Sequence, residues 1–199
     1  HTLEKNVSGN KYLPLWVGEL YLEYHRGTYT SMARNKRYNR KSEFAYQNEE
    51  MYALLDSRLN GAEYPEEALR EGWETILRNQ FHDILPGSSI REVYEDSKEE
   101  YEKILGESRK VTGGSLKHLA ASVNAPARSL VVFNPNSAAA CDVVTFACPD
   151  GLDRPAVYDG GQELPAQKAA DGSWMFTASG VPGKGYKTFR LAESSRKDQ

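Results

Sequence analysis

A change in hydrophobic period near residue 124 constrains this chain more than any other feature of its sequence. Before that position, apolar residues recur every three or four places, as they do in amphipathic helices. After Asn124-Ala125-Pro126, short β-rich runs alternate with turns that contain Gly or Pro. The sequence therefore predicts an α+β fold, in which a three-helix bundle is followed by a portion of an antiparallel β-sandwich.

The first helix is predicted between Asn39 and Leu59, where large apolar residues follow helical spacing. We expect its buried face to consist of Phe44, Met51, Tyr52, Leu55 and Leu59. Gly61 is a suitable end for this helix, because glycine readily adopts the left-handed conformation that closes many helices.

A second helix is predicted to begin at Pro65, because proline fits the first helical turn and the following carboxylates meet the positive end of the helix dipole. Its apolar stripe is broken only by Gln80 and consists of Leu69, Trp73, Ile76, Leu77 and Phe81. The helix should end near residues 82–87, because the residue before Pro86 disfavours helical backbone.

A third helix is predicted to begin at Ser89, which together with Glu92 has the form of a capping box. We expect its buried face to contain Ile90, Val93, Tyr94, Tyr101, Ile104 and Leu105. Gly113-Gly114 is expected to interrupt it, since glycine weakens a helix interior. Three antiparallel helices with short connections would form a small bundle.

The second part of the chain is predicted to hold strands at residues 130–133, 142–146, 174–177 and 186–191, with turns at 159–161 and 182–185 between them. Cys141 and Cys148 stand seven positions apart and could bridge a hairpin. Two cysteines in a chain with ample core fall far short of a disulfide framework, so we interpret them as free structural thiols.

Charge and hydropathy exclude two classes of partner. The 199 residues contain 25 basic and 28 acidic side chains, a net charge of −3 that gives no electrostatic reason to expect nucleic acid. The basic run at residues 34–41 is interpreted as a solvated helix face. No apolar run approaches the roughly 20 residues needed to cross a bilayer, so we expect no membrane contact. The chain begins at His1, so we expect it to be a piece of a longer protein.

The pair His82-Asp83 is the first candidate for chemistry. Without further information, the imidazole is better explained as a cap on the end of the second helix, where a cation is favoured. A single histidine rarely marks a metal site, and no H-E-x-x-H or H-x-D pattern links His82 to the histidines elsewhere in the chain.

The second candidate is the segment 16–31, in which carboxylates and an arginine are mixed with Trp16, Tyr21, Tyr24, His25 and Tyr29. Aromatic faces beside hydrogen-bonding groups suit sugars, but core packing explains the same residues equally well. Glu19 and Glu23, four apart on one expected helix face, cannot easily flank a glycosidic bond, so we assign them structural or substrate-orienting roles.

Both candidates lie in stretches that resemble a known family. Residues 13–31, LPLWVGELYLEYHRGTYTS, followed by KRYNR at 36–40 and Glu43, closely resemble the glycoside hydrolase family 38 α-mannosidases. A second similar stretch, RNQFHDILPGSSI, covers residues 78–90. The residues of both stretches are similar to those of the bacterial and cytosolic branch of the family. This similarity implies a cytoplasmic enzyme. The resemblance implies a retaining exo-α-mannosidase that carries a catalytic Zn²⁺ and acts on terminal mannose of an α-mannoside or oligosaccharide.

The resemblance also implies roles for individual residues. His82 matches a zinc ligand, and Asp83 matches the adjacent acid that hydrogen-bonds the mannose. His25 stands where Golgi-type enzymes have a sugar-stacking tryptophan, and Tyr29 is the other expected substrate-binding residue. None of the catalytic residues is expected in this chain, because the nucleophile and the acid/base belong upstream, so the chain alone should be inactive.

The family implies a division of the chain into four parts. Residues 1–38 would close the catalytic β/α domain, 39–123 would form the middle three-helix domain, 124–192 would begin the C-terminal β-sandwich domain, and 193–199 would be a disordered tail. The intact enzyme is also a candidate for homo-oligomer formation. The competing hypothesis is a non-catalytic scaffold or a carbohydrate-binding module.

Overall fold

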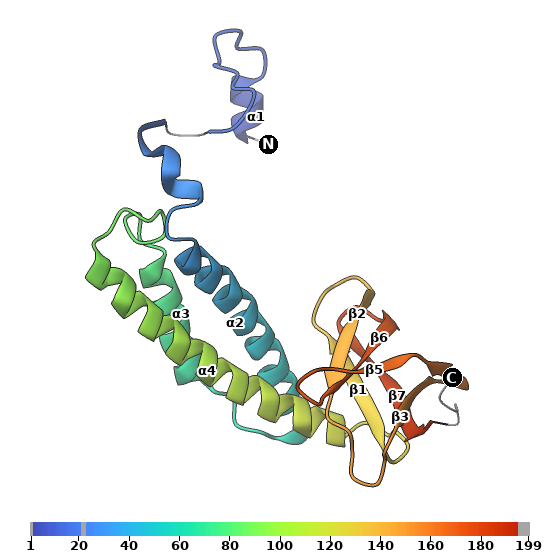
Figure 1. The fold of residues 1–199 in the computed structure, drawn as a ribbon. Helices are drawn as coiled ribbons and strands as arrows, with labels where there is room; N and C mark the ends of the chain where they lie inside the picture. Colours follow the sequence, from blue (N-terminus) through green and yellow to red (C-terminus); the bar gives the residue numbers. More distant parts are fainter. Residues whose placement is uncertain (1, 21–22, 195–199) are drawn as a thin grey trace.

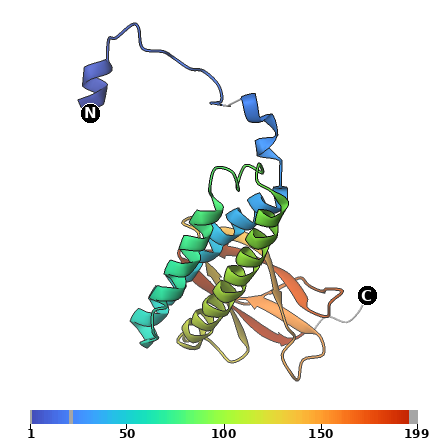
Figure 2. The same ribbon diagram turned by 90° about the vertical axis from the view of Figure 1, so that its left-hand side faces the viewer.

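The computed structural model describes residues 2–20 and 23–194, and it confirms the α+β fold. Three long helices, α2 (Ala33–Asn60), α3 (Glu66–Asn79) and α4 (Arg91–Ala121), form a bundle with the β-sheets at one end (Figure 1). A short helix α1 (Thr2–Val7) and a 3-10 helix η1 (Glu23–Tyr29) precede them. In both views this N-terminal segment projects outward from the end of the bundle that lies far from the β-sheets (Figure 2).

Helices α2 and α4 run parallel with a constant register. Four hydrogen-bonded pairs of side chains, spread from one end of the interface to the other, are each 62 positions apart: Asn35–Ser97, Asn39–Tyr101, Asp56–His118 and Asn60–Ser122. At one end the hydroxyl of Ser97 donates to the Asn35 side chain over 2.7 Å, and at the other Nδ1 of His118 lies 2.9 Å from Asp56 Oδ2. This is the up-down-up arrangement expected of three helices with short connections.

The buried face of α2 is not the one predicted. The buried positions follow a regular three-and-four spacing and are mostly polar: Asn35, Asn39, Ser42, Tyr46, Glu49, Tyr52, Ala53 and Asp56. Of the predicted stripe only Tyr52 is buried, whereas Phe44 and Leu59 are 56% and 69% exposed. The prediction failed because hydrogen bonds to α4 satisfy several of the polar side chains at the interface, so burial does not follow hydrophobicity here.

Much of the predicted stripe instead faces the β-sheets. Met51, Tyr52, Leu55 and Leu59 line a cavity of about 320 Å³ between the end of the bundle and the strands. The rings of Tyr52 and Phe133 meet edge to face, with centroids 5.9 Å apart. The apolar residues of α2 therefore contact the β-sheets as well as the helical bundle.

The ends of the helices confirm one expectation and correct two. Gly61 closes α2 at φ 73° and its N–H donates to the carbonyl of Ser57. The capping box does not form, because α4 begins at Arg91 and the N–H of Ser89 donates to the hydroxyl of Tyr94. Helix α4 also runs unbroken through Gly113-Gly114, since burial of Ser115 and Leu119 against the bundle outweighs a glycine cost of about 1 kcal/mol each.

The strands form two antiparallel sheets, as predicted. One sheet has the order β1-β7-β3-β4 and the other β2-β6-β5. The strand bounds are β1 Ser129–Asn134, β2 Ala140–Phe146, β3 Pro155–Asp159, β4 Gln162–Leu164, β5 Ala166–Lys168, β6 Trp174–Val181 and β7 Gly185–Glu193. The core between them includes Phe176 and Phe189, whose ring centroids lie 5.0 Å apart.

Three further expectations concern the cysteines, the C-terminal tail and membrane-spanning segments. Cys141 and Cys148 are both free, which confirms their interpretation as thiols. Strand β7 extends to Glu193, whose carboxylate accepts hydrogen bonds from the N–H groups of Asp153 and Arg154. The rest of the expected tail, at 195–199, lies outside the described residues. Among the helices at 2–20 and 23–194, none is long and apolar enough to span a membrane.

Candidate functional site

The two sequence stretches singled out above meet at the end of the bundle that lies away from the sheets. The ammonium of Lys36, near the start of α2, donates to the carbonyl of Ser31 over 2.5 Å. The same group donates to the carbonyls of Leu85 and Pro86 over 2.8 and 3.3 Å, in the turn between α3 and α4. One half-buried side chain therefore ties the segment that follows η1 to the turn that follows His82.

The backbones of the two stretches also touch directly at Gly87. This residue has φ +98°, a conformation that side chains rarely adopt. A Cβ added here would lie 2.6 Å from the Cβ of Ser31 and 3.0 Å from its carbonyl carbon and oxygen. The glycine thus permits a close approach that no other residue would allow.

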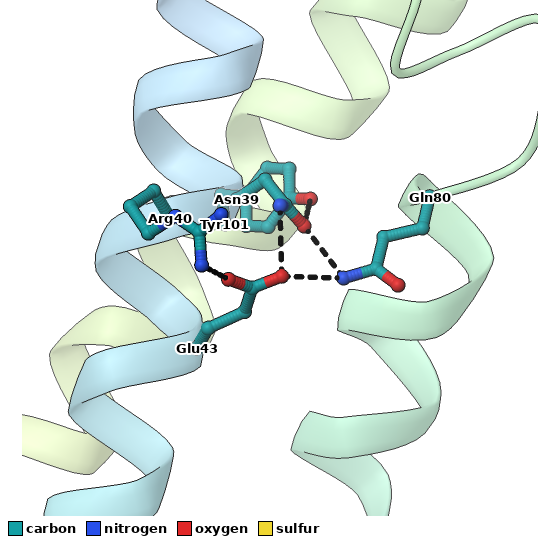
Figure 3. A network of polar contacts seen from close by, with 5 residues as sticks. All are labelled: Asn39, Arg40, Glu43, Gln80 and Tyr101. Atoms are coloured by element: carbon teal, nitrogen blue, oxygen red, sulfur yellow. Dashed lines mark hydrogen bonds and ion pairs between the residues drawn. The ribbon is translucent and has the colours of Figure 1, made fainter. Parts of the chain in front are cut away.

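A network of polar side chains holds the other side of the turn (Figure 3). Gln80, which caps α3, donates through Nε2 to Asn39 Oδ1 over 3.0 Å and to Glu43 Oε1 over 2.9 Å. Glu43 also accepts from Asn39 and from Arg40, and the hydroxyl of Tyr101 lies 3.4 Å from Asn39 Oδ1. All three helices are joined here, two residues before His82.

Tyr94 supports the turn from α4. Its hydroxyl donates to the carbonyl of Ile84 over 3.1 Å and accepts from the N–H of Ser89 over 3.1 Å. Tyr94 itself is only 5% exposed. Donors from α2 and α4 thus bind three successive carbonyls of the turn, those of Ile84, Leu85 and Pro86.

His82 and Asp83 stand on this clamped turn with their side chains in the open. The imidazole is 77% exposed and the carboxylate 55%, and His82 Nε2 lies 3.4 Å from Asp83 Oδ2. The hydroxyl of Ser88 lies 3.4 Å from Asp83 Oδ1, and the ring of Phe81 lies beside the imidazole with centroids 4.1 Å apart. The backbone is held while the two functional groups remain accessible.

Tyr29 lies next to the same turn. It lines a hollow of about 430 Å³ with Thr28, Lys36, Asn39, Arg40, Leu85 and Pro86. The ring is 61% exposed. The structure therefore brings Tyr29 to the segment that carries His82 and Asp83, as a shared sugar site would require.

The remaining residues of the aromatic segment do not join this group. Trp16 and Tyr24 are 68% and 91% exposed, so they do not belong to the core of this chain. His25 interrupts η1 with φ −125° and ψ 56°, and within 2–20 and 23–194 it has no hydrogen-bonding partner. Tyr21 lies outside the described residues.

Glu19 and Glu23 do not share a helix face, contrary to the expectation. Glu19 lies in an irregular segment, where its carbonyl accepts from Trp16 Nε1 over 2.8 Å. Glu23 begins η1 and pairs with Arg26 over 2.8 Å. The expected helix was inferred from spacing alone, and the described residues there pack against little that would stabilise one.

The basic run of α2 is only partly a solvated face. Arg34, Arg37 and Lys41 are exposed, as expected. Lys36 is instead drawn inward among carbonyl groups, and burial lowers its pKa. Arg40 binds Glu43 within the polar network. Two members of the run therefore build the site.

The donor set near the turn fits one part of a zinc site. A catalytic zinc ion takes three protein ligands and leaves one position open. No group of three or more histidine, cysteine or acidic residues lies close enough to hold a metal in the described part of the chain. His82 and Asp83 offer accessible nitrogen and oxygen donors, so residues 2–20 and 23–194 could supply a share of the zinc ligands, and they hold no complete set.

Sequence reasoning missed three residues that organise the site. Gln80 gave a signal as the single polar break in an apolar stripe, but nothing identified its partners. Lys36 was indistinguishable from its basic neighbours, and Tyr94 was expected only as a core residue. Each acts through a residue distant in sequence, which local patterns do not reveal.

Comparison with known proteins agrees with this arrangement. Residues 23–119 match the sequence profile of the alpha mannosidase middle domain, and the match covers η1, α2, α3, the clamped turn and nearly all of α4. An alpha-mannosidase of Saccharomyces cerevisiae is 49% identical over 84 residues, 41% of this chain and 8% of the relative. Alpha-mannosidase G of Dictyostelium discoideum is 42% identical over 105 residues, 52% of this chain and 10% of the relative.

A solved structure shares the fold beyond the matched helices. A glycosyl hydrolase family 38 protein from Enterococcus faecalis superposes with a TM-score of 0.70 over 98% of this chain and 28% of its own, at 18% identity. The helical unit is thus an alpha mannosidase middle domain. Together these similarities support a fragment of a glycoside hydrolase family 38 alpha-mannosidase. It spans only 8% and 10% of the lengths of the two curated relatives.

Proposed function

We propose that this chain is part of a zinc-dependent retaining exo-α-mannosidase that removes terminal α-mannosyl residues. His82 would supply one zinc ligand, and Asp83 and Tyr29 would contact the mannose. His25, which does not line the hollow beside Tyr29, is assigned to the mannose from the family resemblance. The observation that carries the proposal is the junction of the two sequence stretches, where exposed His82 and Asp83 stand on a turn tied to the segment of Tyr29. The match of residues 23–119 to the alpha mannosidase middle domain supports the same conclusion.

The residues have chemistry suited to these roles. A neutral imidazole coordinates zinc through one ring nitrogen. Because the His82 side chain is exposed, it can bind a zinc ion whose other ligands come from elsewhere in the enzyme. The Asp83 carboxylate is an acceptor for sugar hydroxyls, and the Tyr29 ring offers an apolar face and a hydroxyl. A bound zinc ion would orient and polarise hydroxyl groups of the sugar.

The cleavage step itself is assigned to residues outside this chain. A retaining glycosidase needs two carboxyl groups about 5 Å apart on opposite sides of the scissile bond, one as nucleophile and one as acid and base. We propose that both come from the upstream catalytic domain, so the 199-residue chain alone should show no turnover. The division at residues 1–38, 39–123 and 124–192 is part of this proposal.

The setting of the enzyme is a further part of the proposal. A cytoplasmic location is supported by the two free thiols, which suit a reducing compartment. The proposed partner is an α-mannoside or oligosaccharide, and the intact enzyme would associate with copies of itself.

Metal content of the intact enzyme tests the role of His82. We expect His82→Ala to lose zinc and activity together, while His118→Ala, which alters a histidine paired with Asp56 at the other end of the bundle, keeps its zinc. Unchanged metal content in His82→Ala would show that His82 is only a helix end. Mannose binding by the isolated chain, with no zinc requirement, would favour a carbohydrate-binding module.

A further inference from the structure

Lys36 occupies an unusual place for a lysine of a basic run. Its ammonium contacts three carbonyl oxygens, and in the described part of the chain it has no carboxylate partner. An ammonium offers three donors on a compact centre, which matches three acceptors that converge on one point. Holding a charge there costs desolvation, as the lowered pKa shows, so the contacts must offset that cost.

The three carbonyls belong to both parts of the proposed site. Ser31 lies two residues after Tyr29, whereas Leu85 and Pro86 lie two and three residues after Asp83. The contacts to the turn span 49 and 50 positions in sequence, so no local interaction can replace them. Gly87 packs on Ser31 at the same junction and leaves no room for even a methyl group.

The other supports of the turn act on different sides. Gln80 fixes the end of α3 before His82, and Tyr94 holds the turn to α4. The hydrogen bonds of Gln80 run to Asn39 and Glu43, and those of Tyr94 stay within the turn. Lys36 and the Gly87 contact, by contrast, join the segment that follows Tyr29 directly to the turn that follows Asp83.

We propose that Lys36 is a positioning residue, which sets the distance between Tyr29 and the turn carrying His82 and Asp83 by donating to carbonyls on both. This inference rests on the proposed function. Its consequence is that metal affinity and sugar affinity depend on a side chain that touches neither metal nor sugar. Groups that orient a metal ligand indirectly typically change metal affinity or activity by about 10- to 100-fold when they are lost.

The test compares Lys36→Met with Lys41→Met in the intact enzyme. Methionine keeps the apolar stem and removes the donors, and Lys41 is an exposed lysine of the same helix. Zinc affinity is measured by competition with a chelator, and the environment of the metal by the visible spectrum after substitution with Co²⁺. Circular dichroism establishes that both variants retain their helices.

We expect Lys36→Met to bind zinc about 10-fold or more weakly, to show an altered Co²⁺ spectrum and to have a raised KM for an aryl α-mannoside. Lys41→Met should match the wild type, and Lys36→Arg should recover part of the zinc affinity because it restores charged donors. A folded Lys36→Met enzyme with wild-type zinc affinity and spectrum would overturn the positioning role, as would Lys36→Arg no better than methionine. His82→Ala measured alongside separates the two proposals, since retention of zinc in that variant would overturn the proposed function instead.

Discussion

Gly72 offers a sharp test of how the bundle is packed, because two effects of replacing it with alanine oppose each other. In an exposed helix interior, glycine to alanine stabilises a protein by about 1 kcal/mol. Gly72 is buried in α3, and a Cβ there would lie 2.0–2.1 Å from two ring carbons and the hydroxyl oxygen of Tyr46. Contacts that close cannot persist, so either the helix or the ring must move.

Tyr46 has little freedom to yield. Its ring is 1% exposed, packs edge to face on Trp73 with centroids 5.8 Å apart, and its hydroxyl lies 3.4 Å from the carbonyl of Ile104. Overpacking of this kind costs about 3 kcal/mol at the upper end of its usual range. After the gain in helix propensity of about 1 kcal/mol, we expect Gly72→Ala to lower the free energy of unfolding by about 2 kcal/mol.

Urea unfolding of the 199-residue chain, followed by far-UV circular dichroism, measures this difference. Gly106→Ala is the matched control, because Gly106 lies within α4 and a Cβ there would meet nothing within 4 Å. We expect that control to stabilise the chain by about 0.5–1 kcal/mol. If Gly72→Ala stabilised the chain as Gly106→Ala does, the packing of α3 on Tyr46 described here would be wrong.

Two further predictions concern a buried carboxyl group and the core of the sandwich. Burial raises the pKa of Glu49, and its Oε2 has no hydrogen-bond partner in the described part of the chain. The protonated carboxyl is favoured in the folded chain, so this contribution to the free energy of unfolding is complete at acid pH and is lost as pH rises through the raised pKa. Glu49→Gln should therefore make the free energy of unfolding decline less between mildly acidic and mildly alkaline pH, as measured by urea unfolding at each pH. Phe189 is fully buried against Phe176, so Phe189→Ala should cost about 3–5 kcal/mol, and a calorimetric transition unchanged from the wild type would refute that packing.

Local patterns in the sequence predicted where helices and strands lie better than they predicted which side of a helix is buried. The glycine that ends α2, the hairpin at Asp159 and Gln162 and the succession of short strands all follow from residues adjacent in the chain. The buried face of α2 does not, because polar residues such as Asn35 and Asp56 are accepted in the interface only where α4 supplies partners 62 positions later. The unbroken course of α4 through two glycines has the same origin, since packing outweighed propensity.

The candidate site divides in a similar way. The sequence by itself determined the order of helices and strands, the free thiols as the preferred state, and the two stretches whose residues suit sugar and metal chemistry. Only the tertiary structure decided that these stretches meet, because Lys36 and Gly87 contact residues about 50 positions away. It also decided that Gln80, the polar break in an apolar stripe, joins three helices beside His82. Side-chain types and their spacing are properties of the chain, whereas partners for a buried charge or amide exist only once distant segments have packed together.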